Sequence, residues 1–251
     1  MTSLAPRLTR IQVHPIKTLD PVEVQSTVIG PTGSLKFDRA WALHSLDGRI
    51  ISATRVPAMH LIRATYSPDF SRVTLAVPTH PENIEPTTFA FPADTKPAAT
   101  WFSKFLNLPV MVRHDPKGIP DDLIAGGPTV ISTASFDTVA AWFPGMSIAE
   151  ARLRFRANLE LDGVPAFWED QLFGAELRSV VRFRLGEVAF EGSYPCIRCP
   201  NPARDPRTGE DMAGFQKRFT QLRRQQLPSW THADRFEHFY CLATTTRIAS
   251  T

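Results

Sequence analysis

The N-terminal third of the chain alternates between apolar and polar positions in short runs, which predicts strands. One pair of runs flanks Asp47-Gly48, a dipeptide typical of a hairpin turn. Strands at this spacing predict a small barrel or sandwich. The predicted strand segments are 8–16, 22–30, 40–52, 61–66 and 71–78.

The remaining residues mix helical and strand patterns. Helical spacing of apolar residues predicts helices at 99–108, at 135–143, where Ser132, Thr133 or Ser135 is available as N-cap, and at 214–227. Alternation predicts a hairpin around Gly186 and a last strand over 235–248. A proline-rich, weakly periodic segment at 80–98 is the best candidate for a domain junction, so we expect domains at 1–95 and 96–251.

The segment 152–163 alternates as a strand would, placing Arg152, Arg154 and Arg156 on one face. Three arginines on one face are typical of a solvated surface. A second interpretation is an anion site, for phosphate above all, because the guanidinium group matches phosphate oxygens. Asn158 continues this face and offers an amide to a heterocycle.

Composition limits the class of protein. The 251 residues are 43% hydrophobic and 10% aromatic, which is typical of a globular protein. A net charge of +3 is too small to indicate nucleic-acid binding, whereas an anionic small molecule fits. No apolar run is long enough to span a membrane, and three cysteines cannot build a disulfide framework. We therefore expect a cytoplasmic protein without a membrane anchor.

Two of the cysteines, Cys196 and Cys199, form a C-x-x-C pair. Four interpretations stay open: a zinc site with His238 and Cys241, a redox pair, two inert buried thiols, or one thiolate that binds a different metal. Arg198 lies between the cysteines, and its positive charge favours a thiolate. A thiolate is a soft ligand, and the remaining ligands of such a metal can come from a cofactor.

Two further segments carry chemistry. Lys17 and Thr18 follow the first strand and precede an Asp-Pro turn, a modest indication of phosphate binding. Asp38 and Arg39 precede an apolar strand and are also typical of a surface ion pair.

These segments occur in an order that resembles one protein family. PIKTL, FDRAWAL, TRVP, FRANL, and PCIRC with DPRTG lie in sequence between about residues 8 and 247. The chain is similar to the MOSC-domain proteins that carry an N-terminal MOSC β-barrel, the group containing the amidoxime-reducing component. The resemblance implies a mainly β fold with some α: a small N-terminal β-barrel followed by a MOSC β-barrel with peripheral helices.

The resemblance also implies a molybdenum cofactor, a pterin dithiolene with a terminal phosphate. Cys199 matches the family's metal ligand, and Cys196 does not. The other positions that match cofactor contacts, or lie in segments near the cofactor, are Lys17, Thr18, Arg39, Arg55, Ser132, Thr133, Arg156, Asn158 and Arg198. Thr18 replaces the family's usual serine, and Ala157 replaces its usual proline.

The implied activity is reduction of small N-hydroxylated or related N-oxygenated compounds. Because the chain has no four-cysteine cluster pattern, electrons are expected from a separate protein of ferredoxin, flavoprotein or cytochrome type. Asp205 is a candidate proton donor, although Asp-Pro is also a turn former. The alternative is a cofactor carrier or sulfur-transfer protein that uses Cys199.

The predicted basic helix has two interpretations. Lys217, Arg218, Arg223 and Arg224 suit the docking of an acidic electron-transfer partner. They also suit an ordinary solvated helix face.

Overall fold

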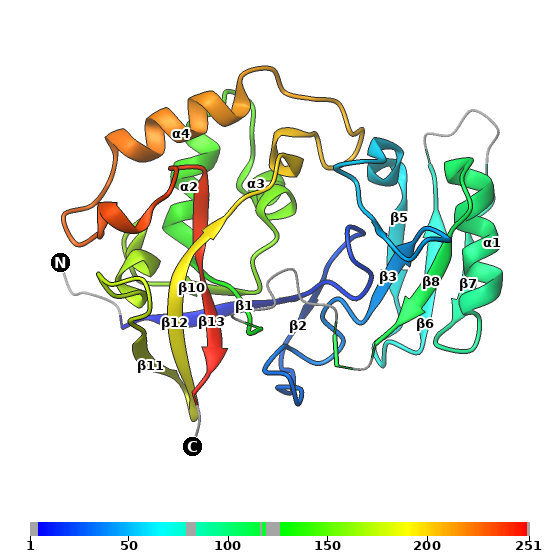
Figure 1. The fold of residues 1–251 in the computed structure, drawn as a ribbon, viewed down its shortest axis with the longest axis horizontal. Coiled ribbons are helices and arrows are strands. Elements are labelled where there is room, and N and C mark those ends of the chain that lie inside the picture. Colours follow the sequence, from blue (N-terminus) through cyan, green and yellow to red (C-terminus); the bar gives the residue numbers. More distant parts are fainter. Residues whose placement is uncertain (1–4, 79–83, 116, 119–125, 250–251) are drawn as a thin grey trace.

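The structure is a computed structural model that describes residues 5–78, 84–115, 117–118 and 126–249. The fold is mainly β with four α-helices in these ranges, as predicted (Figure 1). No helix among the described residues is long and apolar enough to cross a bilayer.

The largest sheet has seven strands and combines both ends of the chain. β1 pairs antiparallel with β10, while β10 and β9 run parallel. In Figure 1, β1 runs from the C-terminal half of the molecule towards the N-terminal half. The sheet order is β11 (Val181–Leu185), β12 (Val188–Ile197), β13 (Cys241–Ile248), β9 (Val130–Ser132), β10 (Leu159–Asp162), β1 (Arg7–Val13) and β2 (Val22–Val24).

Two three-stranded sheets and one helix form the N-terminal half. Their inward side chains share one core, in which Leu43, Leu75 and Phe102 are fully buried. The sheets are β4 (Ile50–Ile51), β3 (Trp41–His44) and β8 (Met111–His114), and β5 (Arg63–Tyr66), β6 (Arg72–Ala76) and β7 (Thr87–Ala90); a 3-10 turn, η1 (Pro57–Leu61), and α1 (Thr95–Leu106) complete this half.

The segment expected to join the domains contributes to this N-terminal core. Residues 87–90 form β7, which pairs with β6, and α1 begins directly afterwards at Thr95. The same core continues to Val110. The N-terminal core therefore extends past the expected boundary at residue 95.

Three helices pack against the seven-stranded sheet: α2 (Thr133–Ala141), α3 (Ile148–Phe155) and α4 (Phe215–Gln225). They bury Phe136, Phe155 and Phe219 in a second core. Figure 1 shows all three beside the same end of the sheet. Short 3-10 turns, η2 (Trp168–Leu172), η3 (Asn201–Ala203) and η4 (Ala233–Arg235), connect the remaining elements.

The strand predicted over 152–163 is confirmed only over Leu159–Asp162, which form β10, and is wrong over residues 152–155, which form the last turn of α3. Ser147 caps the helix by accepting a hydrogen bond from the Glu150 N–H at 3.1 Å. Ile148, Ala151 and Phe155 then supply the helical spacing of apolar residues. Ser147 and Glu150 have the spacing of a capping box, which outweighs the arginine alternation.

The other predicted elements are largely confirmed. The helices at 99–108, 135–143 and 214–227 correspond to α1, α2 and α4, and the hairpin around Gly186 joins β11 to β12. The strand predicted over 22–30 is confined to Val22–Val24. The last strand begins only at Cys241, after a turn.

Candidate cofactor-binding site

Lys17 and Thr18 lie where the chain leaves β1. The Lys17 N–H donates to the Trp41 carbonyl at 2.8 Å, which fixes this turn against β3. Thr18 has a φ of 82°, an unusual conformation for a β-branched residue. Thr18 also lines a small cleft together with Arg156 and His60. Its strained backbone indicates that surrounding contacts hold this turn in place.

Arg39 is brought to the same turn by a reciprocal pair of hydrogen bonds. The His14 N–H donates to Asp38 Oδ1, and the Arg39 N–H donates to the His14 carbonyl, both at 2.8 Å. The Asp38 carboxylate also pairs with the Arg39 guanidinium. The Asp-Arg dipeptide is therefore docked on the end of β1 and is not a solvated surface pair.

Arg156 enters the site from the C-terminal half, as the left-handed C-cap of α3 with a φ of 53°. Nη2 of its guanidinium is buried and has no hydrogen-bond partner among the described residues. Burial and the neighbouring Arg39 lower the pKa of Arg156 to about 10. A buried guanidinium nitrogen without a partner is costly, so a ligand that accepts from it would be bound favourably.

Lys17, Arg39 and Arg156 form one cationic group, called the cation cluster below. Burial, Arg39 and Arg156 lower the pKa of Lys17 to about 8, and Asp38 and Cys199 only partly offset this. Mutual repulsion of this kind is relieved by a bound anion. Among the described residues, eight non-glycine residues have positive φ, and Thr18, Arg39 and Arg156 are three of them. Such conformations gather at ligand sites.

The three arginines expected on one face have different environments. Arg152 makes a bidentate ion pair with Glu160: Nη2 donates to Oε1 at 2.6 Å and Nε donates to Oε2 at 2.8 Å. Arg154 pairs with Glu150 and also donates to the carbonyls of Pro202 and Arg204. Of the three, only Arg156 joins the cation cluster, because the helix turns the other two away from it.

Cys199 lies in the loop between β12 and η3, and its side chain is exposed. The Arg198 guanidinium donates to the Phe155 carbonyl at 2.8 Å and from Nε to the Leu242 carbonyl at 3.0 Å. Together with Arg154, this side chain fixes the backbone on both sides of Cys199. Arg198 therefore positions the loop, and its donors are directed to carbonyl groups.

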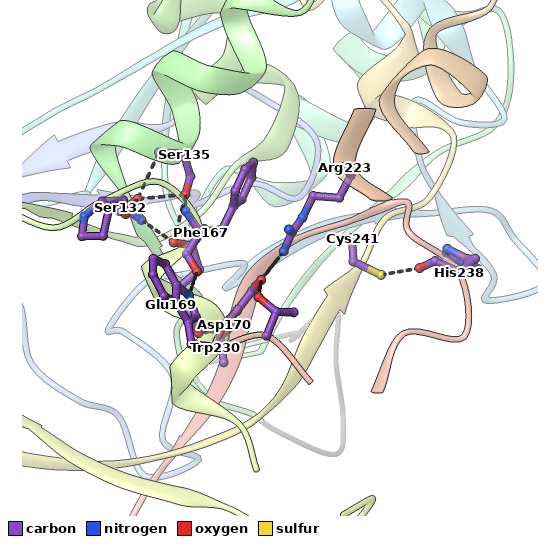
Figure 2. Close-up of polar contacts among 12 residues, drawn as sticks. Ser132, Ser135, Phe167, Glu169, Asp170, Arg223, Trp230, His238 and Cys241 are labelled. Atoms are coloured by element: carbon purple, nitrogen blue, oxygen red, sulfur yellow. Dashed lines mark hydrogen bonds and ion pairs between the residues drawn. The ribbon is translucent and has the colours of Figure 1, made fainter. Parts of the chain in front are cut away.

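The described residues do not assemble the alternative zinc site of the C-x-x-C pair with His238 and Cys241. No group of three or more His, Cys, Asp or Glu side chains able to hold a metal occurs in the described ranges. The Cys241 thiol donates to the His238 carbonyl at 3.0 Å (Figure 2), and burial followed by the nearby Cys196 raises its pKa to about 12. Cys196 is half-buried against the second core, so Cys199 is the exposed thiol of the three.

Asn158 and Asp205 make contacts within the chain. Asn158 Nδ2 donates to the Gln12 carbonyl at 3.0 Å, and its Oδ1 accepts from the Thr129 N–H at 3.2 Å and lies 3.5 Å from Arg39 Nη1. Asp205 accepts from the Arg207 and Thr208 N–H groups. Burial raises the pKa of Asp205, but these hydrogen bonds outweigh it and the net shift is downward. Asp205 is thus an ionised turn former.

Ser132, Thr133 and Arg55 lie outside the cation cluster. Ser132 caps α2 and shares a buried network with Ser135 and Glu169 (Figure 2). Thr133 donates to Glu160 at 2.9 Å. Arg55 is exposed and lines a separate groove beside Leu46, Ile51 and Leu108.

Two residues near the site were not predicted from the sequence. His14 is buried between Arg39 and Arg156, and burial and these two cations keep its pKa well below the usual value. Neither ring nitrogen makes a hydrogen bond of normal geometry to a described residue. Tyr240 is the second: its carbonyl accepts from the Arg198 N–H at 3.0 Å, next to Cys199. The one feature of the sequence that could have indicated His14 is its position three residues before Lys17.

Comparison with known families identifies two domains in the chain. A family described as the MOSC N-terminal beta barrel domain matches residues 5–109, and the MOSC domain matches residues 128–241. The chain therefore belongs to the MOSC-domain proteins that carry an N-terminal MOSC barrel domain. MOSC domains are associated with molybdenum-cofactor proteins. A search of the curated proteins gives no match to this chain.

Proposed function

We propose that this protein binds a molybdenum cofactor and reduces N-hydroxylated compounds with electrons from a separate redox protein. The observation that carries the proposal is the cation cluster with the exposed Cys199 thiol beside it: a thiolate at Cys199 acts on the pKa of Lys17. A cofactor that combines a phosphate with a metal lacking one sulfur ligand matches this pairing.

Each residue has a distinct part in holding the cofactor. Lys17, the Thr18 hydroxyl and Arg39 would bind the phosphate, whose charge relieves their mutual repulsion. Arg156 has an unsatisfied buried nitrogen to donate towards the pterin side. Cys199 would supply the thiolate ligand, on a loop that Arg154 and Arg198 hold rigid.

The reaction converts R–NH–OH, two electrons and two protons into R–NH2 and water. When bound, the cofactor would supply the two-electron exchange. The chain orients the substrate at the Cys199 loop and controls the electrostatics there. Asp205 is not included, because its carboxylate is engaged in its own turn. The electron donor is a second protein, and the free cysteines fit a reducing compartment such as the cytoplasm.

One observation favours a second candidate function. Cys199 is exposed and free, as a cysteine that carries sulfane sulfur in a transfer reaction must be. In that case the protein would hold a persulfide at Cys199 and would not turn over an N-hydroxylated substrate.

The two functions are separated by assaying benzamidoxime reduction with a chemically reduced dye as donor. The protein is purified from a host that makes the cofactor, with Cys199→Ser and the matched control Cys196→Ser. The proposal expects turnover in the wild type and in Cys196→Ser, and none in Cys199→Ser. A persulfide on Cys199 by mass spectrometry, without benzamidoxime reduction, would replace the proposal with sulfur transfer.

A further inference from the structure

A groove of about 710 Å³ begins at the residues on both sides of Cys199 and continues along α4. Arg198 and Pro200 form one end of it, and His238 and Tyr240 form part of its wall. This volume lies within the range of about 300 to 1,000 Å³ typical of small-molecule sites. Cys199, which lies between Arg198 and Pro200 in the chain, is itself exposed.

Tyr240 provides an unsatisfied polar group at this groove. The side chain is 6% exposed, and its hydroxyl has no hydrogen-bond partner among the described residues. A buried hydroxyl without a partner is costly, and a ligand oxygen in the groove would accept its hydrogen bond.

The side chains along the groove give it a positive charge. Lys217 and Arg224 line the groove from α4 and lie about two helical turns apart on the same face of the helix. Neutral glutamine and threonine side chains line the groove with them. No aspartate or glutamate is among the described residues that line it. Arg198 contributes less, because its guanidinium is directed to the Leu242 and Phe155 carbonyls.

We propose that this groove is the substrate site and that it selects N-hydroxylated compounds carrying an anionic group. The N–OH end lies at Cys199 and accepts a hydrogen bond from Tyr240, and the anionic end lies at Lys217 and Arg224. This inference rests on the proposed function for its N–OH chemistry. A groove of this volume, with the partnerless Tyr240 hydroxyl in a residue that lines it, suits a small molecule.

The test compares benzamidoxime with its para-carboxylate as substrates, using reduced dye so that no protein donor is needed. Lys217→Ala/Arg224→Ala is compared with Lys96→Ala/Lys104→Ala, which removes two exposed lysines from α1 and changes the net charge equally. The wild type and the α1 control should prefer the carboxylate in kcat/KM. In the groove variant, the ratio of kcat/KM for the carboxylate to kcat/KM for benzamidoxime should be about tenfold lower, chiefly because KM for the carboxylate rises.

Binding of the para-carboxylate by calorimetry gives a readout that does not depend on turnover. If neither substrate is reduced but the wild type binds the carboxylate and the groove variant does not, the proposed function fails and the groove assignment holds. If benzamidoxime is reduced but neither preference nor binding depends on Lys217 and Arg224, the groove assignment fails alone. A defect seen only with a protein donor would also overturn it, because these cations would then dock that donor.

Tyr240→Phe tests the other end of the groove. The variant should retain its thermal stability, because the removed hydroxyl has no described partner, and should lose about tenfold in kcat/KM for both substrates. Unchanged kinetics would show that Tyr240 is only a core residue and would contradict the orientation proposed here.

Discussion

Arg223 of α4 and Asp170 of η2 form an ion pair with almost no access to solvent. The side chains are 1% and 3% exposed, and Arg223 Nη2 lies 2.7 Å from Asp170 Oδ1 (Figure 2). The guanidinium also lies 4.0 Å from the centre of the Phe167 ring. The basic pattern of α4 therefore includes one arginine that is part of the core, so Arg223 cannot dock a partner.

Replacing Arg223 is expected to destabilise the protein far more than replacing its neighbour. Arg223→Ala leaves Asp170 buried without its partner and should lower the free energy of unfolding by about 3–5 kcal/mol. Arg224→Ala removes an exposed side chain and should change it by less than about 0.5 kcal/mol. Guanidinium unfolding of both variants measures this, and equal effects would contradict the buried ion pair.

The free energy of unfolding should depend on the ionisation of Glu169, which lies in the same buried region (Figure 2). Burial and Asp170 raise the pKa of Glu169 from 4.5 to about 7. Between these values the folded protein binds more protons than the unfolded chain, so stability falls as pH rises through 7. The expected loss is on the order of 3 kcal/mol.

Glu169→Gln should remove this pH dependence, whereas Glu176→Gln, at an exposed position, should retain it. Urea unfolding from pH 5 to pH 8 provides the comparison. If wild type and Glu169→Gln show parallel pH profiles, Glu169 is not buried as described.

Inorganic phosphate should stabilise the protein without its cofactor through the cation cluster. At ten times its Kd, a ligand that binds only the folded state stabilises by about 1.4 kcal/mol. The melting temperature should therefore rise in phosphate relative to chloride at equal ionic strength. Lys17→Met should lose this rise, and Lys104→Met, on the exposed face of α1, should keep it. An equal rise in Lys17→Met would place phosphate elsewhere.

Thiol reactivity should follow the burial of the three cysteines. Iodoacetamide is expected to modify Cys199 first, because it is exposed, and to leave Cys241 unmodified while the protein is folded. Burial raises the pKa of the Cys241 thiol to about 12, which leaves little thiolate to react. Peptide mass mapping after a short reaction measures this order, and early labelling of Cys241 would be inconsistent with the fold.

The sequence predicted most elements whose apolar spacing is regular, such as α1, α4 and the hairpin joining β11 to β12. It failed where a local cap competed with alternation: Ser147 and Glu150 start a helix that occupies the first four residues of the segment assigned to a strand. It also could not show that β1 joins the C-terminal sheet, because pairing between residues so far apart depends on the whole fold.

The candidate site divides in a similar way. Motif order identified Lys17, Arg39, Arg156 and Cys199, which the structure brings to one region. Three other members of the motifs hold the chain in place, because the side chains of Asn158, Asp205 and Arg198 bond to backbone groups. A sequence records which residues are polar, but only the folded chain shows which of them still have hydrogen bonds to offer.

The most direct test of the proposed function is the molybdenum content of protein purified from a host that makes the cofactor. Wild type, Cys199→Ala and the matched control Cys196→Ala are compared by mass spectrometry. The proposal predicts molybdenum in the wild type and in Cys196→Ala, and its loss from Cys199→Ala. Molybdenum retained in Cys199→Ala, or zinc in its place in the wild type, would contradict the assignment of Cys199 as the metal ligand.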